Sequence, residues 1–172
     1  LAELPDDVFI AVNVASASLA RPGHSEWVLG LFQREHVDPG RLHLEVTETT
    51  LLGDMEPVRA EMEMMARAGV LWYVDDFGTG YSSLGYLHRF PLLTLKIDRS
   101  FVAPLTAPLA NQGSASAAVV RAVVALAGSL GLSVVAEGIE TQAQADALCA
   151  LGCHLGQGFL FAKPGPLPAS SA

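Results

Sequence analysis

The chain has 172 residues, a net charge of −8 and a hydrophobic share of 51%. This length suffices for one domain with a sizeable core, and the hydrophobic share excludes a disordered chain. The negative charge argues against a basic groove for long nucleic acid, although a small anionic ligand can still bind through a bridging cation.

Two cysteines and the absence of zinc-type spacing predict a reducing compartment, so we expect a cytoplasmic protein or the cytoplasmic part of a larger, membrane-attached one. No leader-like segment is evident at the start of the sequence. The most apolar stretch, 115–135, contains Arg121, Gly128 and Gly131, so we interpret it as a helix, a loop and a strand rather than a membrane segment.

Short apolar runs alternate with helical patterns along the chain. The predicted strands are Phe9–Val14, Leu42–Thr47, Leu71–Asp75, Thr94–Asp98, Ser133–Glu137 and Leu155–Leu160. The predicted helices are Ser25–Glu35, Pro57–Ala68, Ser83–Phe90, Ala117–Leu130 and Gln142–Leu151.

This alternation predicts an α/β fold with a parallel sheet. Six βα units fit either an open doubly wound sheet or a barrel that lacks its first strands, because a full eight-stranded barrel usually needs about 250 residues. We expect residues 1–164 to form this domain and 165–172 to be a flexible tail.

Charged side chains fall at or near the carboxyl ends of the predicted strands, where α/β proteins carry their sites. A single acid in such a place is usually a surface residue, but five with the same placement indicate a shared site. Carboxylates that converge repel one another, and divalent cations with oxygen ligands relieve that repulsion. The carboxylates are Glu45, Asp75, Asp76, Asp98 and Glu137, with Asn13 and Gln157 as neutral oxygen donors and Lys96 as the one cation.

Five segments together resemble the motifs of EAL-domain cyclic di-GMP phosphodiesterases. The segments are Glu45-Val46-Thr47-Glu48, Asp75–Leu84, Leu95-Lys96-Ile97-Asp98 with Phe101-Val102, Val135–Thr141, and Gln157–Phe161 with Lys163-Pro164. Asn13-Val14-Ala15 is similar to a further family motif, in which serine stands where this chain has Ala15.

The resemblance implies a (β/α)8 TIM-type barrel of which this chain carries the last six βα units. The strand with the Glu-Ala-Leu signature, whose glutamate binds metal in the family, is not among the motifs found. The implied reaction is the hydrolysis of one phosphodiester bond of cyclic di-GMP to give the linear dinucleotide, with one or two Mg²⁺ or Mn²⁺ ions as cofactors.

The resemblance also implies a role for each candidate. Asn13, Glu45, Asp75, Asp76, Asp98 and Gln157 would bind metal, Lys96 would orient or polarise the attacking water, and Glu137 would be either a ligand or the general base. Glu140 would steady the loop that contains Phe77, Gly78, Thr79, Gly80 and Tyr81, and would link it to a dimer contact. Arg99 is a candidate for contact with a substrate phosphate, although a surface role fits it equally well.

Two other functions remain open from the sequence alone. One is a receptor that binds cyclic di-GMP without cutting it, and the other is a dimerisation or regulatory module without a ligand. The family resemblance further implies a homodimer and a fused sensor or diguanylate cyclase domain outside this chain.

Overall fold

The computed structural model of the chain describes residues 4–5, 8–52, 55–80, 84–105 and 114–165. In the described residues six strands are hydrogen-bonded in chain order, β1-β2-β3-β4-β5-β6. The pairs β1–β2, β4–β5 and β5–β6 are parallel. The strands are β1 Ile10–Asn13, β2 Leu42–Thr47, β3 Leu71–Phe77, β4 Leu92–Ile97, β5 Ser133–Ala136 and β6 Leu155–Gly156.

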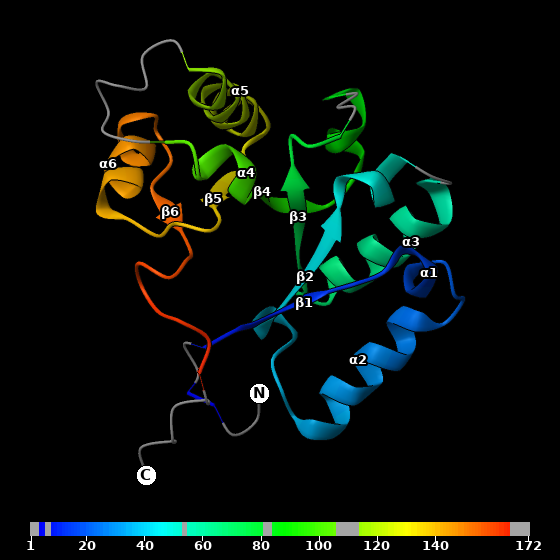
Figure 1. Ribbon diagram of the computed structural model, residues 1–172. Helices are drawn as coiled ribbons and strands as arrows, with labels where there is room; N and C mark the ends of the chain where they lie inside the picture. Colours follow the sequence, from blue (N-terminus) through cyan, green and yellow to red (C-terminus); the bar gives the residue numbers. More distant parts are fainter. Residues whose placement is uncertain (1–3, 6–7, 53–54, 81–83, 106–113, 166–172) are drawn as a thin grey trace. The chain divides into compact units, whose positions relative to one another are not determined.

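Helices connect these strands, as the alternation predicts (Figure 1). The α-helices are α1 Ser16–Leu19, α2 His24–Glu35, α3 Met55–Arg67, α4 Arg99–Val102, α5 Ala115–Leu130 and α6 Gln142–Ala150. The 3₁₀ helices are η1 Pro39–Arg41, η2 Glu48–Leu52 and η3 Leu84–Arg89. The fold is therefore of the α/β class, with six strands that alternate with helices as the sequence predicts.

The described residues form two compact units, and β3 contributes residues to both. Unit 1 holds the described residues up to Tyr73 together with 84–92, and unit 2 holds 74–80 and the described residues from Leu93 to Gly165. Each unit is described by itself below.

Unit 1 has its core between β2, β3 and the helices α1, α2 and α3, which contact one another. Trp72 on β3 is fully buried, and its indole Nε1 donates a hydrogen bond of 3.1 Å to the Met62 carbonyl of α3. Ser25 near the start of α2 is also fully buried, and its backbone N donates to Glu61 Oε2 of α3 at 2.8 Å. These two polar contacts fix α3 against its neighbours, because a buried polar group without a partner is costly.

Unit 2 is built around β4, β5, β6 and α5. Leu95 and Ile97 of β4 are fully buried, and the intervening Lys96 is 3% exposed. Ser114 caps α5 by accepting a hydrogen bond from Ala117 N at 3.1 Å. The Thr141 side chain caps α6 by accepting from Gln144 N.

Most predicted elements are confirmed, but two are wrong. The segment predicted as a helix over Ser83–Phe90 contains a 3₁₀ helix, η3, and the predicted strand Leu155–Leu160 ends at Gly156. Beyond that point the chain wraps around Ile139, whose backbone N donates to Gln157 O at 3.1 Å and whose O accepts from Leu160 N at 3.0 Å. Gly158 permits this close approach, since a Cβ there would lie 2.2 Å from Ile139 O. The predicted tail at 166–172 lies outside the described residues.

The burial of Trp72 generates the first prediction. Trp72→Phe removes the indole hydrogen bond to the Met62 carbonyl and leaves unfilled space in the core, so we expect it to lower the free energy of unfolding by about 1–3 kcal/mol. Trp27→Phe is the matched control, because Trp27 is 65% exposed and surface changes usually stay within about 0.5 kcal/mol. Urea unfolding measures both, and equal effects of the two substitutions would contradict the described core.

Candidate metal centre

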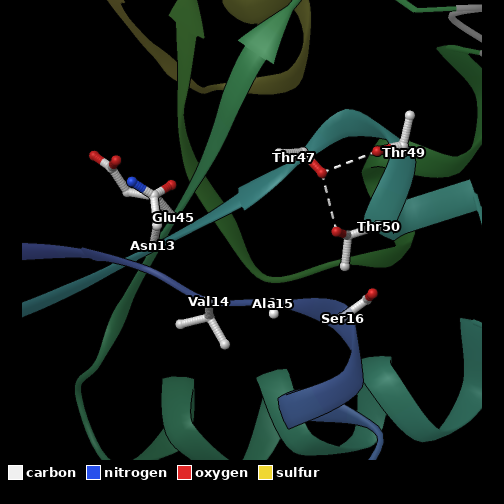
Figure 2. A pocket seen from close by; sticks show the side chains of 8 residues that line it. All are labelled: Asn13, Val14, Ala15, Ser16, Glu45, Thr47, Thr49 and Thr50. Atoms are coloured by element: carbon white, nitrogen blue, oxygen red, sulfur yellow. Dashed lines mark hydrogen bonds between the residues drawn. The ribbon is translucent and has the colours of Figure 1, made fainter.

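Two of the predicted ligands, Asn13 and Glu45, lie side by side in unit 1. They are register partners across β1 and β2, and the next residue of β1, Val14, donates its backbone N to Glu45 O at 2.8 Å. Glu45 is 6% exposed, whereas Asn13 is exposed. Figure 2 shows the Asn13 amide and the Glu45 carboxylate adjacent to each other.

A cavity of about 690 Å³ adjoins this pair and is rich in hydroxyl groups. The Thr47 hydroxyl lies 3.0 Å from that of Thr49 and 3.1 Å from that of Thr50, and all three residues line the cavity (Figure 2). The 3₁₀ turn of η2 brings these threonines together. The prediction from sequence missed them, because no periodic pattern announces a 3₁₀ helix of five residues.

The other candidates are gathered in unit 2 around a buried lysine. Lys96 Nζ lies 3.1 Å from Asp75 Oδ1 and 2.6 Å from Glu137 Oε1. Gln157 Nε2 donates a hydrogen bond of 2.7 Å to the same Glu137 oxygen. Strands β3, β4 and β5 thus bring the carboxylate of Asp75, the ammonium group of Lys96 and the carboxylate of Glu137 into direct contact. Gln157, just after β6, orients the Glu137 carboxylate.

Asp75 and Asp76 are neighbours in sequence, yet their carboxylates converge. One oxygen each of Asp75, Asp76 and Glu137 lies within 4.8 Å of the other two. Successive side chains of a regular strand point to opposite faces, but Asp76 has φ +54° and breaks that alternation. Thr79 holds this turn, because its backbone N and its hydroxyl both donate to Asp76 O, at 3.3 and 2.8 Å.

Asp98 completes the acidic group at the end of β4. Burial alone would raise the pKa of Asp98, but hydrogen bonds from the Ser100 hydroxyl and amide and from the Arg99 backbone outweigh it and lower the pKa. The pKa of Asp76 is raised by burial and by the negative charges of Asp75 and Asp98. Asp98 therefore ionises more readily than an ordinary aspartate, and Asp76 ionises less readily.

The coupling residues predicted around the loop are only partly described. Phe77 is 2% exposed, Gly78 has φ +97°, and Thr79 and Gly80 follow it in the described part of the loop. Tyr81 lies outside the described residues. Glu140 and Arg99 form an ion pair with Nη2–Oε1 of 2.6 Å.

The donor set in unit 2 fits a divalent cation. The carboxylates of Asp75 and Glu137 contact the ammonium group of Lys96. Asp76 lies beside these two acids, and Asp98 interacts with Asp76. Burial raises the pKa of Asp76 first, and the negative charges of Asp75 and Asp98 raise it further, although Lys96 acts against them. Carboxylate and amide oxygens are the ligands that Mg²⁺ and Mn²⁺ prefer, so the site is suited to a hard cation.

Comparison with known proteins identifies the fold to which this geometry belongs. The sequence profile described as "EAL domain" matches residues 1–164. The chain belongs to the EAL-domain family. The fold is consequently that of the EAL barrel, and the six strands and their connecting helices described above are the part of it that this chain carries.

Similar proteins with solved structures include EAL domains bound to ligands. The chain resembles a structure named the MucR phosphodiesterase in complex with c-di-GMP, with a TM-score of 0.85 and 43% identity over 92% of this chain and 68% of that one. It also resembles Klebsiella pneumoniae BlrP1 in a manganese and cyclic di-GMP complex, with a TM-score of 0.80 and 32% identity over 91% of this chain and 39% of that one.

Curated relatives are named as enzymes of cyclic di-GMP turnover. The chain is 44% identical to the bifunctional diguanylate cyclase/cyclic di-GMP phosphodiesterase MucR of Pseudomonas aeruginosa, covering 91% of this chain and 22% of MucR. It is 37% identical to the Escherichia coli cyclic di-GMP phosphodiesterase PdeL, covering 95% of this chain and 44% of PdeL. This EAL domain thus spans less than half the length of either relative.

The sequence analysis interprets the apolar stretch 115–135 as a helix, a loop and a strand rather than a membrane segment. Among the described residues of this EAL domain, no helix has both the length and the apolar composition that a bilayer crossing requires. The apolar stretch from Ala115 forms the 16-residue helix α5 and the strand β5, as predicted.

The raised pKa of Asp76 generates the second prediction. Because the folded-state pKa of Asp76 is raised, its ionisation disfavours the folded state above the unfolded pKa of about 3.9. Asp76→Asn removes this charge and, since asparagine also tolerates a positive φ, keeps the turn. We expect the metal-free variant to melt at a higher temperature than the parent at pH 7, by a few degrees at most because solvent screens the group.

The gain should disappear as the pH falls below the unfolded pKa, where Asp76 is protonated in both states. Mn²⁺ at one hundred times its dissociation constant should stabilise the parent by about 2.7 kcal/mol and the variant by less. Differential scanning fluorimetry with and without a chelator measures both effects. Asp146→Asn on the exposed face of α6 is the control, and an equal gain there would show that the effect is unrelated to the acidic group.

Proposed function

We propose that this chain carries a metal-dependent hydrolytic site for cyclic di-GMP and cleaves one phosphodiester bond to give the linear dinucleotide. The observation that carries the proposal is the buried Lys96 between Asp75 and Glu137, with Asp76 beside them. Relatives named as cyclic di-GMP phosphodiesterases, and a related structure named as a complex with that dinucleotide, support the choice of substrate.

Asp75, Asp76, Asp98 and Gln157 in unit 2 would hold Mg²⁺ or Mn²⁺, and the family resemblance adds Asn13 and Glu45 of unit 1 to the ligand set. A related structure named as a manganese complex supports the choice of metal. A bound cation of this kind polarises a phosphate and lowers the pKa of water.

The chain's own residues would divide the remaining work. Lys96 is held by Asp75 and Glu137 at 3.1 and 2.6 Å, so its ammonium group is fixed in direction and would orient the attacking water. Glu137, steered by Gln157, would be a ligand or would accept a proton from that water. Because Lys96 is buried, its charge acts in a medium that screens it weakly.

Phe77, Gly78, Thr79, Gly80 and Tyr81, with Glu140, would couple this site to a homodimer contact, as the family resemblance implies. The cysteine usage favours a cytoplasmic location, and the family resemblance implies a cyclase or sensor domain outside this chain. The name of MucR, which includes a diguanylate cyclase, supports such a combination.

The proposal predicts a loss of hydrolysis on substitution of the lysine or its acidic partner. Asp75→Asn and Lys96→Met should each lower kcat/KM by roughly a hundredfold or more, because each removes a charge fixed in a site of low polarity. The measurement is chromatographic detection of the linear dinucleotide, made on the full-length natural protein with Mg²⁺ or Mn²⁺.

Asp146→Asn is the matched control for the aspartate, since Asp146 Oδ1 only accepts an exposed hydrogen bond from Gln142 Nε2 that an asparagine oxygen can also accept, and it should retain full activity. If the parent protein binds cyclic di-GMP but forms no product with either metal, it is a receptor and the hydrolytic proposal is wrong. If neither binding nor turnover occurs, the ligand itself is wrong.

A further inference from the structure

Arg99 is the first residue of α4 and directly follows Asp98. Its side chain extends to the turn that follows β5, made by Glu137, Gly138, Ile139 and Glu140 and called here the β5 turn. Two contacts of different kinds join Arg99 to this turn, one from its aliphatic stem and one from its guanidinium group.

The stem packs directly on Gly138. A Cβ added at Gly138 would lie 2.4 Å from Arg99 Cγ, 2.8 Å from Cδ and 2.9 Å from Cβ. Gly138 also has φ +67°, which disfavours any larger residue. The absence of a side chain at this position therefore permits both the turn and the close approach of the arginine.

The guanidinium group pairs with Glu140, with Nη2 2.6 Å from Oε1. The two side chains are 62% and 42% exposed, and an exposed pair of this kind contributes little to the free energy of folding. The pair can nevertheless direct the arginine stem across Gly138, because it holds the far end of that side chain in one place.

The rest of the β5 turn is held by backbone contacts to both neighbouring strands. Glu137 N donates to Ile97 O at 3.1 Å, and Ile139 N donates to Gln157 O at 3.1 Å. Glu140 N donates to Gln144 Oε1 at 2.8 Å, at the start of α6. Two side-chain ion pairs also join the turn to the end of β4: Lys96 binds Glu137 inside the site, and Arg99, just after the strand, binds Glu140 at the other end of the turn.

The position of these contacts relative to the acidic group gives them a function. Asp98 is the residue before Arg99, and Glu137 is the residue before Gly138. The contact of Arg99 with Gly138 therefore sets the spacing between two acids that arise from different strands. We propose that Arg99 is a positioning residue, which holds Glu137 at a fixed separation from Asp98 and so sets the affinity for a divalent cation without touching the cation or the substrate.

This inference rests on the proposed function, because it takes the acidic group to bind metal. It differs from the alternative that Arg99 contacts a substrate phosphate. A phosphate contact would affect KM and leave the metal affinity unchanged, whereas a positioning residue affects the metal affinity measured without substrate.

The test measures Mn²⁺ affinity by titration calorimetry on the full-length natural protein without nucleotide, together with kcat and KM for cyclic di-GMP. Arg99→Ala should weaken Mn²⁺ binding about five- to twentyfold, a coupling of about 1–2 kcal/mol, with kcat restored at saturating Mn²⁺ and KM unchanged. Arg99→Lys keeps the stem and a positive charge, so its metal affinity should stay within about threefold of the parent.

A double substitution separates a direct contact from a general loss of stability. Gly138→Ala should weaken Mn²⁺ binding more than Arg99→Ala does, because the new methyl group overlaps Arg99 Cγ and Cδ. Adding Arg99→Ala to Gly138→Ala removes those two atoms, so the double variant should bind Mn²⁺ more tightly than Gly138→Ala alone. Such non-additivity is expected only of residues in contact.

Three outcomes would overturn the inference. They are an unchanged Mn²⁺ affinity in Arg99→Ala with a raised KM, a double variant as weak as the two single effects combined, and a parent protein that binds no Mn²⁺. The third outcome also contradicts the proposed function, whereas the first two leave it intact, since there the parent still binds metal and hydrolyses the dinucleotide.

Discussion

The repulsion between carboxylates around Lys96 is the constraint on which the rest of the site depends. The buried ammonium group of Lys96 depends on the carboxylates of Asp75 and Glu137 beside it, since an unpaired charge in such a place is very costly. Burial and the negative charges of Asp75 and Asp98 both raise the pKa of Asp76. Acids gathered in this way reduce the stability of the folded chain, and such a cost is common at functional sites.

The strands bring the acids to one end of a sheet, but local irregularities make them converge. A regular strand would send Asp75 and Asp76 to opposite faces. The positive φ of Asp76 and the two hydrogen bonds from Thr79 replace that alternation with a turn. A non-glycine residue in this conformation costs of order 1–2 kcal/mol, and aspartate is among the residues that tolerate it best. The turn at the end of β3 therefore directs the Asp76 carboxylate toward that of Asp75.

Strand ends and their polar residues could be predicted from the sequence because period-two patterning and parallel pairing are local and regular. The bounds of β2 and the meeting of Asp75 with Glu137 follow from these rules, whereas the convergence of Asp76 with them depends on its positive φ. The end of β6 could not be predicted, since Gln157 and Gly158 leave the strand to wrap Ile139, a residue eighteen positions earlier. The contact between Arg99 and Gly138 could not be predicted either, because non-local packing leaves no periodic pattern in a sequence. The clustering of the Thr47 hydroxyl with its neighbours was missed because a 3₁₀ turn leaves no such pattern.

The β5 turn shows how several physical requirements fall on consecutive residues. Glu137 supplies a carboxylate, Gly138 allows the arginine stem to pass, and Glu140 fixes the end of that stem. Thr141 then caps α6, with Gln144 accepting hydrogen bonds from the backbone N of both Glu140 and Thr141. The helix cap holds the last residue of the turn, and strand β5 holds the first. A segment with so many separate constraints has few permissible substitutions, which gives a physical reason why the run Val135–Thr141 resembles a family motif.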